Sequence, residues 1–318
     1  MPGSNDEGNE KRSGAGTAPR APNNGGAGGV RGTTRVVGVF GYPVRHSASP
    51  PMHNAAFGAL GLDFVYVPFE VAPDALGEAL AGVRALGLAG VNVTVPLKEL
   101  VALHLDAVTE RAQAIGSVNT VVNENGRLLG DSTDGPGFLQ ALAHAEVANV
   151  AGEKVVVLGA GGSARAVVHA LVEAGAGRIY VANRSLDRAE ALVEQVGGGT
   201  TGPARAVPLT EPALREALGG AAVLVNTTSV GMHPREDEMP PVPEDALVAP
   251  LLVSDLIYNP PETRLLALAR SRGCRTQNGV EMLVRQGALA FSRWTGIAEP
   301  PLDVMRAAVR AAVAAPRA

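Results

Sequence analysis

The sequence predicts an α/β protein with two domains, each built on a parallel or mostly parallel sheet that helices cover. Short apolar runs, typical of buried strands, alternate with segments in which Leu and Ala recur at helical spacing. In the second half, one apolar run leads directly into a glycine-rich turn and then into a helix. The 318 residues, 46% of them hydrophobic, provide enough apolar side chains for two cores.

The composition narrows the class of protein. Aromatic residues make up only 3% of the chain, so we expect cores of Ala, Val and Leu. A net charge of -4 and a pI near 5.9 provide no broad attraction to nucleic acid or to an anionic membrane. The chain has no apolar run of the roughly 18 residues that cross a bilayer, and its start has no apolar signal-peptide core. The single cysteine, Cys274, fits a reducing compartment, so we predict a cytoplasmic protein.

The first domain is expected over residues 35–136. Residues 1–34 precede it and are rich in Gly, Asn, Pro, Ala and Arg, so we expect a disordered tail there. The elements predicted within the domain are strands at 35–40, 64–69, 91–95 and 118–122, a helix at 73–86, and a turn at Asn125-Gly126.

A second series of elements predicts another domain over residues 137–279. A helix at 136–145 leads into it, and the chain from 280 to 314 is predicted to be largely helical. The elements predicted between them are strands at 154–158, 178–182, 222–225 and 251–255, and helices at 164–174, 186–195 and 262–270.

The glycine-rich turn predicts a dinucleotide site of the Rossmann type. The strand at 154–158 runs into Gly159-Ala160-Gly161-Gly162-Ser163, and a helix follows. Here Gly159 permits a tight turn, and Gly161 leaves room for a pyrophosphate near the N–H groups that begin the helix. Plain loops also contain such glycines, but in this chain the flanking strand and helix are both present.

The end of the next predicted strand favours NADP over NAD. An NAD enzyme carries an acidic residue about 20 residues after the glycines, where it binds the ribose 2′-hydroxyl. This chain instead has Asn183-Arg184-Ser185, with Arg188 one turn further. A guanidinium can pair with a 2′-phosphate or stack on adenine, although two surface arginines are also commonplace in an Arg-rich chain.

Short polar side chains follow several strand ends of the first domain, where α/β sheets bind their ligands. Ser47 and Ser49 follow the first strand beside prolines that fix the turn. An alternative for Ser49 is the N-cap of a helix that has Pro50 at its first position. The other candidates of this kind are Thr94, Lys98, Asn119 and Asp134.

Lys98 is the candidate acid–base residue. Lys11, Lys98 and Lys154 are the only lysines among 27 basic residues, which raises the question of what an arginine could not do at position 98. Reducing a ketone needs a nearby acid for the forming alkoxide, and a lysine can release its proton whereas an arginine does not. A carboxylate such as Asp134 would orient the amine. A surface ion pair of little energetic value is the alternative.

Metal binding is not predicted. His46 and His53 lack the spacing of a metallohydrolase helix, and no cysteine or acidic partner accompanies them. We expect these two histidines to pack or to form hydrogen bonds near the turn.

Short motifs with polar or glycine-rich cores follow one another along the chain from about Val37 to Trp294. They are residues 41–50 (GYPVRHSASP), 92–98 (NVTVPLK), 116–120 (GSVNT), 132–135 (STDG), 159–162 (GAGG), 183–184 (NR), 226–229 (NTTS) and 278–283 (NGVEML). In these motifs and in their order, the sequence resembles the shikimate dehydrogenase family. This resemblance implies that NADPH reduces the ring ketone of 3-dehydroshikimate during aromatic amino-acid biosynthesis.

The resemblance also implies roles for individual residues. Lys98 and Asp134 would form the catalytic pair, and helices from residues 280–318 would return to complete the first domain. Ser47, Ser49 and Tyr258 would receive the substrate carboxylate, while Thr94, Asn119 and Gln286 would bind ring hydroxyls together with the pair. Gly159 to Ser163 would hold the pyrophosphate, Asn183, Arg184, Ser185 and Arg188 the 2′-phosphate, Leu256 and Gly279 the nicotinamide end, and Glu110 a further part of the cofactor.

Two departures from the family pattern keep a polar side chain: Ser132 replaces the usual Asn, and Ser185 stands where Thr is frequent. The long tail is not part of the pattern. An oxidative quinate/shikimate dehydrogenase that uses NAD is one alternative, although the paired serines and Asn183-Arg184 argue against it. A ligand-sensing regulator is another, but a sensor has no need of the proton donor Lys98. The small-molecule substrate is the expected partner, and a homodimer is possible.

Overall fold

The computed structural model describes residues 29–145 and 149–314. The predicted tail lies outside the described residues as far as residue 28, as do the last four residues of the predicted C-terminal helices. Just before the first strand, Thr33 and Thr34 donate hydrogen bonds of 2.6 and 2.7 Å to the Asp63 carboxylate. Defined contacts therefore begin slightly earlier than the expected start at residue 35.

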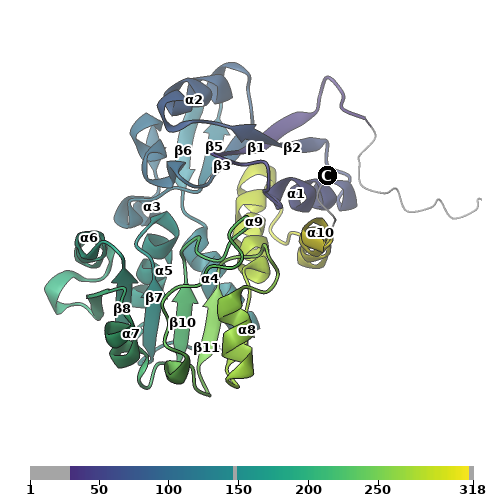
Figure 1. The fold of residues 1–318 in the computed structure, drawn as a ribbon. Helices are drawn as coiled ribbons and strands as arrows, with labels where there is room; N and C mark the ends of the chain where they lie inside the picture. The colour runs from purple at the N-terminus through teal and green to yellow at the C-terminus, as the bar shows by residue number, and fades with distance from the viewer. Residues whose placement is uncertain (1–28, 146–148, 315–318) are drawn as a thin grey trace, which may run out of the picture.

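The described chain forms two lobes, each with a six-stranded sheet (Figure 1). In the first sheet, β1 pairs in parallel with β2 and β3, but β3–β5 and β5–β6 are antiparallel. Because β4 also pairs in parallel with β6, three of the five pairings are parallel, and the expectation of a mostly parallel sheet is confirmed. A tight turn at Asn125, with a φ of 56°, reverses the chain between β5 and β6, which makes that pairing antiparallel. In order across the sheet, the strands are β2 (Phe64–Glu70), β1 (Arg35–Gly41), β3 (Gly90–Val93), β5 (Thr120–Glu124), β6 (Arg127–Asp131) and β4 (Ala107–Val108).

The second sheet is parallel throughout, and its order winds outward in both directions from the pair β10–β7. This is the strand order of a Rossmann fold, whose ligands bind beyond the carboxyl ends of the strands at that central pair. In order, the strands are β12 (Arg275–Gln277), β11 (Leu252–Asp255), β10 (Val223–Asn226), β7 (Lys154–Leu158), β8 (Arg178–Asn183) and β9 (Ala204–Pro208).

Helices cover both faces of the second sheet, because alternate side chains of β7 face opposite ways. Val155 and Val157 pack toward α4 (Asp134–His144), α5 (Gly162–Glu173) and α6 (Leu186–Val196). Val156 and Leu158 pack toward α7 (Glu211–Leu218) and α8 (Arg264–Ser271). The domain division expected after residue 136 falls inside α4, whose apolar residues belong to the core of the second sheet.

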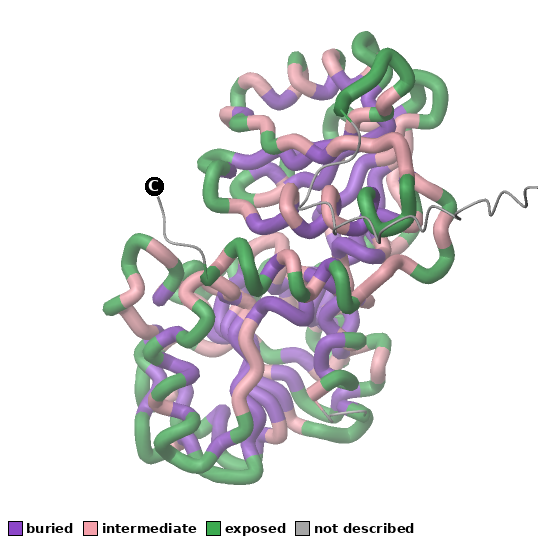
Figure 2. Tube along the Cα trace, turned by 90° about the vertical axis from the view of Figure 1, so that its right-hand side faces the viewer, coloured by how far each residue is buried: buried purple, intermediate pink, exposed green. Residues whose placement is uncertain are grey.

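The first sheet has one core on each side. One lies beneath α2 (Leu76–Ala85), and the other lies beneath α1 (Ser49–Ala59), α9 (Val280–Thr295) and α10 (Leu302–Ala314). The last two helices therefore return to the first lobe, as expected. Buried segments run through the middle of both lobes, with exposed segments around them (Figure 2). Ala, Val and Leu dominate these cores, and Phe291 and Trp294 of α9 pack with Tyr66 of β2 in an aromatic group.

Candidate active site

The segments after β1 and β3 lie side by side, because these strands are parallel neighbours whose carboxyl ends share one edge of the sheet. The Thr94 amide fixes them together by donating a hydrogen bond of 2.9 Å to the Phe40 carbonyl. Lys98 follows on a short 3₁₀ helix, η2 (Leu97–Glu99). This arrangement directs the Lys98 side chain toward the start of α4 and the glycine-rich turn of the second sheet.

Lys98 and Asp134 form an almost buried ion pair. The Lys98 Nζ lies 2.5 Å from Asp134 Oδ2, and the two side chains are 13% and 6% exposed. The same nitrogen lies 3.3 Å from the hydroxyl of Ser163, which belongs to the glycine-rich turn of the second lobe. The sequence-predicted pair is therefore brought together, at the boundary between the two sheets.

Asn119 holds the carboxylate in place from the other side. Its Nδ2 lies 2.8 Å from Asp134 Oδ1, and its Oδ1 accepts a hydrogen bond of 2.8 Å from the Thr133 amide. Gln286, on α9, places its Oε1 3.1 Å from the same Asn119 Nδ2. Three predicted substrate-binding residues thus form one hydrogen-bonded group around Asp134: Lys98, Asn119 and Gln286.

Two tyrosines lie beside the predicted serine pair. The hydroxyl of Tyr258 faces the Ser47 side chain and the Ala48 backbone, and that of Tyr66 faces Ser49. Burial raises the pKa of each tyrosine, so both hydroxyls stay protonated at neutral pH. The alternative of Ser49 as an N-cap is wrong, because α1 begins at Ser49 itself and its N-cap residue, Ala48, makes no side-chain cap.

Tyr66 and Asn92 are members of this site that sequence reasoning missed. The Tyr66 hydroxyl lies 2.8 Å from Asn92 Oδ1, and Asn92 Nδ2 donates to the Asn119 carbonyl at 3.1 Å. The sequence held a weak signal for each of these two residues. Asn92 lies two positions before Thr94 at the end of one strand, a spacing that places both side chains on the same face, and Tyr66 is one of only four tyrosines in the chain.

The glycine-rich turn has the shape that a pyrophosphate requires. Gly159 has a φ of +108°, and a Cβ there would lie 2.6 Å from the hydroxyl of Thr227. A Cβ on Gly161 would instead meet nothing within 4 Å, so open space lies above the N-terminus of the 12-residue helix α5. At Gly162 a Cβ would lie 3.1 Å from the Lys98 Cβ, which places this cradle directly against the ion pair.

The predicted 2′-phosphate residues lie between β8 and α6. Asn183 ends the strand and donates a hydrogen bond of 2.8 Å to the carbonyl of Ser185, which precedes the helix. Arg184 and Arg188 are both exposed there, so their guanidinium groups are accessible to an anion. Arg184 precedes α6 and Arg188 lies on the first turn of that helix, one turn further, as the motif predicted.

The remaining cofactor candidates are Leu256, Gly279 and Glu110, and they lie in two separate places. Gly279 donates its amide to the Ile257 carbonyl at 2.9 Å, and a Cβ there would lie 2.0 Å from the Leu256 carbonyl, so Leu256 and Gly279 are in close contact. Glu110 begins α3 (Glu110–Ile115), and its side chain is exposed.

The two histidines near the first turn have separate environments. His53 is fully buried and stacks on Tyr66 with ring centroids 4.4 Å apart, and burial lowers its pKa to about 3. The ring of His46 meets the ring of His233, in the second lobe, edge-on at 5.6 Å. Within residues 29–145 and 149–314, no group of three His, Cys, Asp or Glu side chains is arranged to hold a metal ion.

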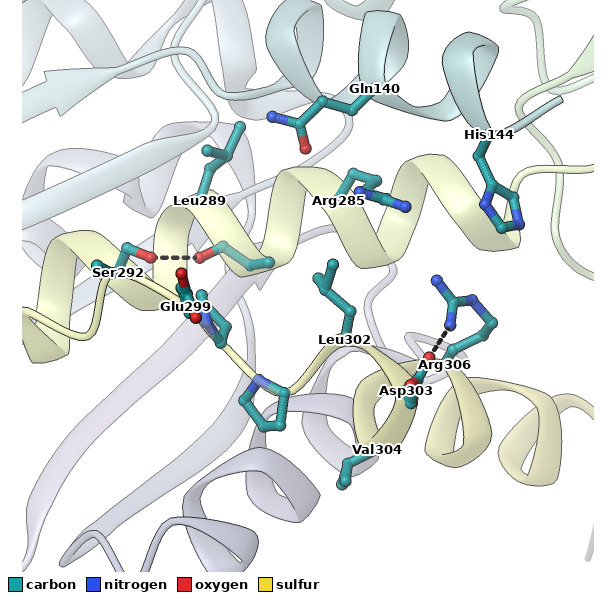
Figure 3. A pocket seen from close by; sticks show the side chains of 14 residues that line it. Gln140, His144, Arg285, Leu289, Ser292, Glu299, Leu302, Asp303, Val304 and Arg306 are labelled. Carbon is teal, nitrogen blue, oxygen red and sulfur yellow. Dashed lines mark hydrogen bonds and ion pairs between the residues drawn. The ribbon is translucent and has the colours of Figure 1, made fainter. Parts of the chain in front are cut away.

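A surface pocket of about 890 Å³ lies apart from the candidate active site, where α4, α9 and α10 meet (Figure 3). Residues such as Gln140, His144, Arg285 and Arg306 line it. None of the predicted catalytic, substrate or cofactor residues is among its lining, so the pocket is not part of the candidate site.

Three family models match successive parts of the chain. The shikimate dehydrogenase substrate binding domain matches residues 39–121, shikimate / quinate 5-dehydrogenase matches 141–240, and the shikimate 5′-dehydrogenase C-terminal domain matches 279–310. The shikimate dehydrogenase (NADP(+)) of Methanopyrus kandleri is 49% identical over 280 residues, which cover 88% of this chain and 96% of that protein.

Solved structures agree with the sequence relatives. A crystal structure of shikimate dehydrogenase in complex with NADP+ matches with a TM-score of 0.85 and 39% identity, covering 91% of this chain and 99% of that one. The Thermus thermophilus enzyme in complex with NADP(H) and shikimate matches with a TM-score of 0.78 and 42% identity, covering 88% and 100%. Sequence, domain models and fold therefore agree: the chain belongs to the shikimate dehydrogenase family.

Proposed function

We propose that the chain is an NADP-dependent shikimate dehydrogenase, which reversibly reduces 3-dehydroshikimate to shikimate on the route to chorismate and the aromatic amino acids. The observation that carries this proposal is the Lys98–Asp134 pair at 2.5 Å, directly against the glycine cradle of the Rossmann sheet. Relatives that share most of the chain's length carry the same activity in their names.

The cofactor residues divide into four groups. The backbone of Gly159 to Ser163 binds the pyrophosphate at the start of α5, where Gly161 leaves open space. When bound, NADPH supplies the hydride that reduces the ketone. Asn183, Arg184, Ser185 and Arg188 hold the 2′-phosphate, Leu256 and Gly279 line the nicotinamide end, and Glu110 supports the cofactor from the first lobe.

Lys98 donates a proton from its Nζ to the ketone oxygen as that oxygen becomes a hydroxyl. Asp134 holds the ammonium group by its 2.5 Å contact, and Asn119 holds Asp134 from the far side. Because both catalytic side chains are almost buried, little water competes for the proton. In the reverse direction, the Lys98 amine takes the proton from the substrate hydroxyl.

The other polar residues bind and orient the substrate. Ser47, Ser49 and Tyr258 present protonated hydroxyl groups, which suit a carboxylate. Thr94, Asn119 and Gln286 bind the ring hydroxyls. Tyr66, which faces Ser49 and is hydrogen-bonded to Asn92, positions the serine end of the site.

Four steady-state rates test this function: shikimate and quinate, each with NADP+ and with NAD+, followed at the absorbance band of the reduced nicotinamide. We expect the highest kcat/KM for shikimate with NADP+. Faster turnover of quinate with NAD+ would instead support the catabolic quinate/shikimate enzyme, and no turnover of any pair would support a ligand-sensing regulator.

We assign residues 35–136, with the helices of 280–318, to substrate binding and residues 137–279 to the cofactor. In the described part of the chain, no helix has the length and apolar character to span a bilayer. A cytoplasmic location suits the one cysteine, which is free and buried. A homodimer stays a prediction, which light scattering of the purified protein would test.

A further inference from the structure

Glu99 lies between the proposed catalytic pair and the proposed 2′-phosphate site. It follows Lys98 directly on η2, in the first lobe, and its carboxylate faces two arginines of the second lobe. Glu99 Oε1 lies 3.7 Å from Arg188 Nη2, and Glu99 Oε2 lies 3.7 Å from Arg165 Nε. Both distances exceed ordinary hydrogen-bond length, so one carboxylate is shared between two cations without a close bond to either.

Arg188 is the partner that a 2′-phosphate would take. Its side chain is 61% exposed, on the first turn of α6 after Asn183-Arg184-Ser185. A phosphate binds a guanidinium through two parallel hydrogen bonds, which is a stronger interaction than an ion pair at 3.7 Å. A phosphate bound there would also lie close to the Glu99 carboxylate, and like charges at that separation repel.

Arg165 is the partner that remains for Glu99. Its side chain on α5 is only 15% exposed and is held by a hydrogen bond from Nη1 to Gln195. Its Nε is buried and has no hydrogen-bond partner in the described part of the chain. Leaving such a donor unsatisfied is costly, so this atom favours the approach of the Glu99 carboxylate once Arg188 is occupied.

We propose that Glu99 is a specificity-determining residue that competes with the 2′-phosphate of NADP for Arg188 and thereby weakens the preference for NADP over NAD. The inference rests on the proposed function, because it takes Arg188 as a 2′-phosphate ligand. NAD has a hydroxyl at this position, so Glu99 has no charge to oppose there.

The test compares the dissociation constants of NADP+ and NAD+, measured by calorimetry, for wild type and for Glu99→Gln. We expect NADP+ to bind about three- to fivefold more tightly to Glu99→Gln, with NAD+ affinity unchanged, as suits the loss of one exposed competing ion pair. Glu124→Gln, which removes the same charge from an exposed position on β5, should leave both constants unchanged.

A second background shows whether the effect passes through Arg188. In an Arg188→Gln protein, Glu99→Gln should no longer change the ratio of the two constants. An unchanged ratio in Glu99→Gln alone, or an equal gain in the Arg188→Gln background, would overturn the inference. Failure of the proposed cofactor assignment is distinguishable, because it would appear as a wild type that binds NAD+ as tightly as NADP+.

Discussion

At the scale of single residues, the chemistry depends on a lysine where this chain otherwise uses arginine. The Lys98 ammonium is almost buried, and its charge is balanced by one carboxylate at 2.5 Å. Such pairs are sensitive to the loss of either partner, because the remaining charge is then buried and uncompensated. An arginine at this position would keep the ion pair but could not release a proton.

Asp134→Asn tests the role of the carboxylate. The amide keeps the size of the side chain but removes the charge that holds Lys98 Nζ, so we expect kcat to fall at least about 100-fold. KM for NADP+ should change little, because Asp134 lies outside the glycine cradle. Steady-state kinetics on the purified variant measure both quantities, and a kcat within twofold of wild type would contradict the assignment.

His53 predicts a loss of stability in mild acid. Burial lowers its pKa in the folded state to about 3, from 6.5 when it is exposed. Between these values the unfolded chain takes up a proton that the folded protein excludes, so the free energy of unfolding falls as pH falls from about 6.5 toward 3. Each unit of difference in pKa corresponds to about 1.4 kcal/mol.

Urea unfolding of His53→Phe at pH 7 and pH 5 measures this contribution. The phenyl ring can stack on Tyr66 as the imidazole does but cannot titrate, so the difference in unfolding free energy between the two pH values should shrink. His104→Asn, at an exposed position, should keep the wild-type difference. The same acid sensitivity in wild type and His53→Phe would show that the ring is not the cause.

At the scale of elements, local patterns predict the strand–turn–helix of β7 and α5 well, because its apolar run and its glycines are continuous in sequence. The Asn125-Gly126 turn was also predicted, but its second strand, β6, was not, and so the antiparallel part of the sheet was missed. Strands β4 and β12 have only two and three residues, too few for alternation to be visible. The helices α3 and α7, of six and eight residues, were missed because one or two turns show little helical periodicity.

A pair of glycine variants separates folding from cofactor binding in the β7–α5 turn. In Gly161→Ala the new methyl group enters open space at an ordinary φ, so the melting temperature should stay at the wild-type value. The methyl group occupies the pyrophosphate position, so KM for NADP+ should rise at least about tenfold. In Gly159→Ala the methyl group meets Thr227 at a positive φ, and we expect a lower melting temperature. Tighter NADP+ binding by Gly161→Ala would contradict the cradle.

At the scale of the whole molecule, the site exists only where the two lobes meet. Gln286 approaches Asn119 across 167 residues of sequence because α9 returns to the first lobe (Figure 1). Sequence reasoning placed Gln286 in the site only through the family resemblance, since a polar residue on a helix has no local signal of function. Tyr66 was missed for the opposite reason, because its apolar strand concealed a hydroxyl that faces the serines.

The most direct test of the account is Lys98→Ala, assayed for turnover of shikimate with NADP+ and for the dissociation constants of both ligands. We expect kcat to fall about 100- to 10,000-fold while both ligands still bind. Lys154→Ala, at the opposite end of β7 from the glycine cradle, should turn over as wild type does. Normal turnover by Lys98→Ala would contradict the assignment of the proton donor.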